Sequence, residues 1–144
     1  MDSFEHVNLN TIDPTTAPFT KSTYTLQVTD AYMKEFEYKK GERAGEKDKF
    51  IKLVLAITNS DRYTGRKVYA SLFNNKGTLI QLRRIMDATG IPQEVGTPMD
   101  EWLTSLKESK ATFNAPVGQE DVRQSDGTTR KSLVANLWEV APAA

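Results

Sequence analysis

The chain has 144 residues, with 19 basic side chains, 19 acidic side chains, one histidine and no cysteine. A domain of this length can bury a full core, and the proportions of 38% hydrophobic and 26% charged residues are typical of a soluble globular protein. The lack of cysteine excludes disulfides, thiolate nucleophiles and cysteine metal ligands.

The neutral total hides an uneven distribution of charge. Residues 34–84 contain 13 basic and 6 acidic side chains, an excess of +7, and the other residues carry −7. Such asymmetry says more about partners than the sum does. The sequence opens without a basic and apolar leader, and no run approaches membrane length, which favours a cytoplasmic protein.

The N-terminal part of the chain predicts an arm followed by a long strand. Residues 1–22 are expected to be extended, because Pro14 and Pro18 prevent a continuous helix. Apolar and polar residues then alternate over 24–38, the period of a half-buried strand. The interruption at Asp30-Ala31 predicts a bulge that bends this strand.

Two further strands complete an antiparallel meander. A charged loop with two glycines, residues 39–49, leads into an alternating strand at 50–57. Turn residues at 59–65 precede the third strand, at 67–73.

A helix is expected next. Thr78 and Gln81 have the spacing of a capping box, and Gly90 and Pro92 end the helix. Its expected apolar stripe is made of Leu79, Leu82, Ile85 and Met86.

The last third of the sequence predicts a short helix and two strands. The helix places Pro98 at its first position and buries Trp102, Leu103 and Leu106. The strands are expected at 111–117 and 132–140, separated by a polar loop at 118–131. Trp138 lies in the second of them, where either face is a plausible inward one.

The order of elements predicts the fold class. Three strands, one or two helices and two more strands are the order of a mainly β, five-stranded OB-fold barrel with its helices between strands 3 and 4. The expected organisation is an extended arm at 1–22, one OB-fold domain at 23–140 and a short flexible C-terminus at 141–144.

No enzymatic site assembles from the sequence. The only histidine, His6, lies in the arm without marked triad partners, and a zinc site lacks ligands. Glu37 and Lys39 have the E-x-K form of a metal-dependent nuclease, but that site needs a second carboxylate from a neighbouring strand. We therefore expect no enzyme, no catalytic residue, no metal and no cofactor.

A binding surface is the better hypothesis. Strand parity groups aromatic and basic side chains on shared faces, which is the mixture that sequence-tolerant binding of single strands requires. The expected phosphate contacts are Lys34, Lys39, Lys40, Lys52, Arg66 and Lys67, and the expected stacking rings are Phe36, Tyr38, Tyr69 and Phe73. The later loop adds Arg123, Arg130 and Lys131. The alternative for each ring is a place in the core, and for each lysine the protection of a strand edge.

Several segments also carry a resemblance to a known family. They are LNTIDP (9–14), YTLQV (24–28), YTGRKV (63–68), DATGIP (87–92), and Asp126-Gly127 followed by Arg130. With these, the chain resembles the phage-encoded single-stranded DNA-binding proteins of the OB-fold type. The resemblance implies sequence-independent binding of single-stranded DNA in phage replication and recombination, in the host cytoplasm, with replication or recombination proteins as further partners.

One departure concerns the C-terminus. Many single-stranded DNA-binding proteins end in an acidic tail that recruits partners, whereas residues 140–144 here carry no side-chain charge. The alternative function is a protein-interaction module, such as a phage assembly or host-takeover factor, that uses the same barrel surface. Self-association through the arm stays open.

Overall fold

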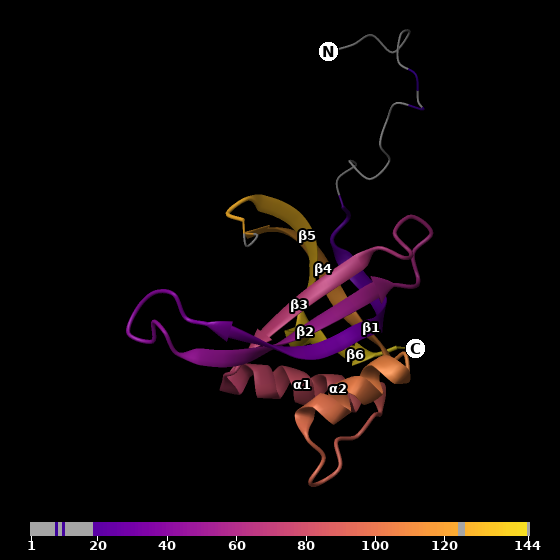
Figure 1. Cartoon of the computed structure of the whole chain (residues 1–144). Coiled ribbons are helices and arrows are strands. Elements are labelled where there is room, and N and C mark those ends of the chain that lie inside the picture. The colour runs from indigo at the N-terminus through magenta and orange to yellow at the C-terminus, as the bar shows by residue number, and fades with distance from the viewer. Residues whose placement is uncertain (1–7, 9, 11–18, 124–125, 144) are drawn as a thin grey trace.

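The computed structural model describes residues 8, 10, 19–123 and 126–143, so most of the expected arm lies outside the described residues. The chain is mainly β, with a six-stranded sheet in which five strands form a ring, and two helices lie beneath one end of the ring (Figure 1). The elements in chain order are β1 (Ser22–Glu37), β2 (Lys47–Ile57), β3 (Lys67–Phe73), α1 (Lys76–Thr89), α2 (Met99–Glu108), β4 (Thr112–Arg123), β5 (Thr129–Ala135), a 3-10 turn (Leu137–Glu139) and β6 (Ala141–Pro142).

The first three strands form the antiparallel meander that their alternation predicted. A bulge interrupts β1 at Thr29, because pairing with β2 passes directly from Val28 to Asp30. The extra residue reverses the parity of the strand, so that Val28 before it and Ala31 and Met33 after it all face inward. The sequence placed the bulge one residue later, where the break in the pattern becomes visible.

The ring closes through β4 and β5. The first half of β1 pairs with β4, and β4 continues into an antiparallel hairpin with β5. β5 meets β3 at a single parallel pair, Tyr69 with Val134, which we call the β3–β5 seam. The short strand β6 pairs with Phe113 and Asn114 of β4, outside the ring.

The core fills the ring and the space between the ring and the helices. Phe113, Leu53 and Leu55 of the strands and Leu103 and Leu106 of α2 are completely buried. Burying each of these side chains stabilises the fold by about 1.5–3 kcal/mol relative to leaving it exposed. No helix in the described ranges is long and apolar enough to span a membrane.

The first helix begins earlier than the capping pattern predicted. Its N-cap is Asn75, whose side-chain oxygen accepts a hydrogen bond from the amide of Thr78 at 2.9 Å. Thr78 is therefore the third helical residue, and it is buried, whereas Leu79 of the predicted stripe is 57% exposed. Gly90 ends the helix as expected, with a left-handed φ of 71° that suits glycine.

The second helix confirms its predicted core contacts. Trp102, Leu103 and Leu106 are buried, and the indole nitrogen of Trp102 donates to the carbonyl oxygen of Ile91 at 2.9 Å. Pro98 is the N-cap, one position before its predicted place.

The predicted loop at 118–131 is mostly strand. β4 continues to Arg123 and β5 begins at Thr129, so only the tip of the hairpin lies between them. The predicted strand at 132–140 is shorter, because the side-chain oxygen of Asn136 accepts the amide of Trp138 at 3.0 Å and caps a 3-10 turn. Leu133 and Leu137 are buried, whereas Trp138 is 45% exposed.

Candidate functional site

The outward side chains of β1, β2 and β3 form a surface of amines and aromatic rings. Strand pairing sets Lys34 opposite Phe50, and Phe50 opposite Phe73. Two residues further along these strands, Lys52 of β2 lies opposite Ser71 of β3. Because alternate residues of each strand point into the core, all of these side chains share the outer face.

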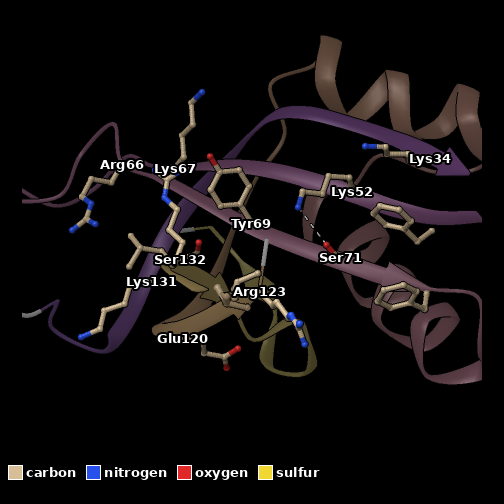
Figure 2. A pocket seen from close by; sticks show the side chains of 16 residues that line it. Lys34, Lys52, Arg66, Lys67, Tyr69, Ser71, Glu120, Arg123, Lys131 and Ser132 are labelled. Carbon is tan, nitrogen blue, oxygen red and sulfur yellow. Dashed lines mark hydrogen bonds between the residues drawn. The ribbon is translucent and has the colours of Figure 1, made fainter. Parts of the chain in front are cut away.

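A groove of about 930 Å³ runs over this face and has the β4–β5 hairpin as its second wall. Figure 2 shows Lys52 and Tyr69 on the side of β2 and β3, and Arg123 and Lys131 on the opposite side. The lining residues are Lys34, Phe50, Lys52, Arg66, Lys67, Tyr69, Ser71, Phe73, Glu120, Val122, Arg123, Arg130, Lys131, Ser132, Leu133 and Val134.

The groove is strongly positive although the chain is neutral. Of the described residues that line it, seven are basic and only Glu120 is acidic, a balance of +6. None of the ion pairs between described residues involves any of the seven. These charges are therefore not neutralised by direct ion pairing within the described part of the protein.

Aromatic rings stand among these charges. The Nζ atom of Lys52 lies 5.2 Å from the centre of the half-buried Tyr69 ring, a cation–π distance. Phe73 is 49% exposed and stacks on Phe50, with ring centres 5.5 Å apart and planes inclined by 29°. Phe36 lies against both, 5.6 Å from Phe73 and 5.8 Å from Phe50.

A network of polar contacts holds the connection between β1 and β2. Tyr38 donates its hydroxyl to Asp48 at 3.2 Å, and the guanidinium of Arg43 lies 4.2 Å from the Tyr38 ring centre. The hydrogen bond from the amide of Lys49 is the main cause that lowers the pKa of Asp48. Partial burial, followed by the hydrogen bond to Asp48, raises the pKa of Tyr38.

Aromatic contacts position Arg66 at another part of the groove. Its guanidinium carbon lies 5.7 Å from the ring centre of Phe19 and 5.9 Å from that of Tyr63. Hydrogen bonds with the hydroxyl and the amide of Thr20 lower the pKa of Tyr63. The cation is thus held against rings that are themselves tied to the start of β1.

The structure brings together six of the ten residues that the sequence singled out. Lys34, Lys52, Arg66, Lys67, Tyr69 and Phe73 line the groove. Phe36 packs against Phe73 and adjoins the groove without lining it. Tyr38, Lys39 and Lys40 lie in the β1–β2 connection, where Tyr38 is engaged with Arg43 and Asp48 and both lysines are exposed.

Four of the basic and aromatic residues that line the groove were not among the ten contact residues predicted from the sequence. Phe50 has the same strand parity as Lys52, so the alternation of β2 contained the signal for it. Arg123, Arg130 and Lys131 were expected to contribute from a loop, and they do face the groove, but from paired strands. Strand pairing fixes their backbone positions more firmly than a loop would.

The chain matches no protein-family model and no curated protein sequence. Among the described residues, no three side chains of His, Asp and Glu gather in a group that could hold a metal ion. Glu35, two residues before the Glu37 considered for a nuclease site, lies 3.6 Å from the Nζ atom of Lys47 in an exposed ion pair.

Proposed function

We propose that the protein binds single-stranded nucleic acid along the groove between the outer face of β2 and β3 and the β4–β5 hairpin. The observation that carries this proposal is the combination of seven basic residues, one acidic residue and accessible aromatic rings in one groove. Cations that follow a backbone and rings on which bases stack are the two requirements for sequence-tolerant binding of single strands.

The rings favour a single strand over a duplex. Phe73 and Tyr69 can stack only on a base whose face is accessible, and in a duplex each face is covered by a neighbouring base pair. A duplex would satisfy the lysines and arginines but would leave the rings unused.

The strand order supports the assignment of the ring to the OB-fold class. Its order is β1-β2-β3-β5-β4, with β4 returning to β1 and both helices between β3 and β4 in the chain. OB-folds bind oligonucleotides over strands 2 and 3 and the loops that join strands 1 to 2 and 4 to 5. The groove lies over β2 and β3 with the β4–β5 hairpin as its second wall, which supports this assignment, although no residue of the β1–β2 connection lines it.

More particularly, we propose a single-stranded DNA-binding protein of phage replication or recombination. This step rests on the resemblance of the sequence to phage-encoded proteins of that kind. The protein would coat exposed single strands in the host cytoplasm and deliver them to replication or recombination enzymes.

The same surface in a protein-interaction module would have to accept a polypeptide. Six excess positive charges in one hollow favour a polyanion over a polypeptide of ordinary composition, because each cation gains from a regularly spaced negative charge. We therefore favour DNA as the ligand and a purely binding role.

Titration of the protein with oligo-dT at several salt concentrations tests the proposal. Binding should be detectable at low salt and should weaken steeply as salt rises, because bound cations replace counterions on the DNA. Oligo-dT should bind more tightly than a duplex of the same length, and oligo-rU in the same titration measures the preference for DNA. Absence of oligo-dT binding at low salt would overturn the proposal, and a protein partner captured by the same groove would favour the alternative.

A further inference from the structure

A second hollow of about 310 Å³ adjoins the groove where β3 and β5 diverge beyond the seam. Ser71, Phe73 and Val134 line both hollows, so the second lies directly beside the groove. Its remaining walls include Gly77 at the start of α1 and Trp138 in the 3-10 turn. A chain that lies in the groove and continues past Phe73 therefore meets Trp138.

The Trp138 side chain is partly exposed, and its ring is held in place by packing against α1. The side chain is 45% exposed, whereas the other tryptophan, Trp102, is buried. The ring lies against Gly77 so closely that a β-carbon at Gly77 would come within 3.2 and 3.3 Å of two ring carbons. Glycine at this position gives the indole room to lie against α1.

Polar contacts hold the turn that carries this ring. Asn136 accepts the amide of Trp138 at 3.0 Å and donates its own side-chain amide to Glu139 at 2.9 Å. Arg84 of α1 donates to the carbonyl oxygen of Trp138, and its guanidinium carbon lies 5.8 Å from the indole centre. A ring that is already held in place loses little conformational entropy when a ligand stacks on it.

We propose that the second hollow is a nucleobase site in which Trp138 stacks on a base that leaves the groove past Phe73. The proposal rests on the proposed function and extends it to a residue outside the face of β2 and β3. The hollow also contains the half-buried amide of Gln81, which offers both a donor and an acceptor to a base edge. The site therefore lengthens the track of bound DNA beyond the β3–β5 seam.

Fluorescence separates this site from the rest of the groove. Titrations of the wild type and Trp138→Phe with oligo-dT of about 4 to 16 nucleotides assign the signal of Trp138 by difference. We expect quenching of that signal only by oligonucleotides long enough to pass Phe73. Trp138→Ala should bind those oligonucleotides about 5- to 150-fold more weakly, and its affinity for the shortest oligonucleotides that bind should be unchanged.

Gly77→Ala is the second variant, because its β-carbon would come within 3.2 Å of a Trp138 ring carbon and of the Asn75 side-chain oxygen, so that the indole is kept but must shift slightly. Alanine is a good helix former, so the variant should fold, and far-UV circular dichroism checks that it does. It should show the same dependence on oligonucleotide length with a smaller loss of affinity than Trp138→Ala, because the ring is shifted and not removed. Wild-type binding with no response from Trp138, together with unchanged affinity of both variants at every length, would overturn the nucleobase site and leave the proposed function intact. A wild type that binds no oligonucleotide would instead refute the proposed function.

Discussion

Replacing Lys52 by alanine should make DNA binding less sensitive to salt. Lys52 lies on the outer face of β2, in the groove, and forms none of the ion pairs in the described part of the chain. Within the protein its Nζ atom donates a long hydrogen bond, 3.4 Å, to Ser71 and lies over the Tyr69 ring. Its charge is therefore available for a phosphate, and its removal leaves no buried group without a partner.

The size of the effect follows from the number of groove cations. Each phosphate neutralised on a single strand contributes about −0.7 to the slope of log K against log salt concentration. If all seven basic residues contact phosphates, the slope is about −5, and affinity falls about 1,000-fold when salt rises fourfold. With six contacts the slope is about −4 and the same rise in salt costs about 300-fold.

The assay is the oligo-dT titration repeated at several salt concentrations. The matched control is Arg83→Ala, which also removes one positive charge, but from an exposed pair with Asp87 on α1, away from the groove. Arg83→Ala should keep the wild-type slope. The reasoning is refuted if Lys52→Ala keeps the wild-type slope, or if Arg83→Ala reduces the slope by as much as Lys52→Ala does.

Substitutions at three further positions test other parts of the structure. Tyr69→Ala should weaken oligo-dT binding by about 1–3 kcal/mol without changing the salt slope, because the Tyr69 ring stacks on a base. Tyr69→Phe keeps the ring and should retain most of the wild-type affinity in the same titration. Phe113→Ala should lower the free energy of unfolding in urea by about 3–5 kcal/mol, because Phe113 is completely buried in β4. Asp48→Asn should make the stability of the protein fall less steeply as the solution becomes acidic. The pKa of Asp48 is lower in the folded state than the unfolded value of about 3.9, so the carboxylate stabilises the fold above that value, and this contribution is lost as the pH falls through the folded-state pKa. Urea unfolding midpoints at a series of pH values measure the effect.

A different result would contradict each of these predictions. For Tyr69, a change in slope as large as that of Lys52→Ala would show that the residue acts through charge. For Phe113, a loss below about 1 kcal/mol would contradict its central place in the core. For Asp48, an acid limb identical to that of the wild type would show that the carboxylate does not contribute to stability through its hydrogen bonds with Lys49 and Tyr38.

Sequence reasoning worked best where one face of a strand is buried. The alternation in β1, β2 and β3 follows directly from a half-buried sheet, and it placed Lys52 and Tyr69 on the outer face. The same reasoning found the buried residues of α2, because a large apolar set repeats there at helical spacing.

Prediction from the sequence was wrong where burial produces no alternation of apolar and polar residues. The ends of β4 and β5 that form the second wall are exposed on both faces, so residues 119–123 and 129–131 read as a polar loop. The start of α1 was misplaced because Asn75 and Thr78 are both good caps, and tertiary packing that buries Thr78 decides between them. The contact of Trp138 with Gly77 joins distant segments, and no local pattern indicates it.

The β3–β5 seam has a consequence for motion. A ring joined by one residue pair at this point should open there first, because local opening is easiest where few backbone hydrogen bonds must break. The groove lies over this point, and its two walls belong to the strands on either side. A bound strand of DNA that contacts both walls would hold them at a fixed separation, so that binding would also stiffen the ring of strands. We expect the β5 amides to exchange their hydrogens more slowly in the presence of DNA, because the bound strand restrains opening at the seam.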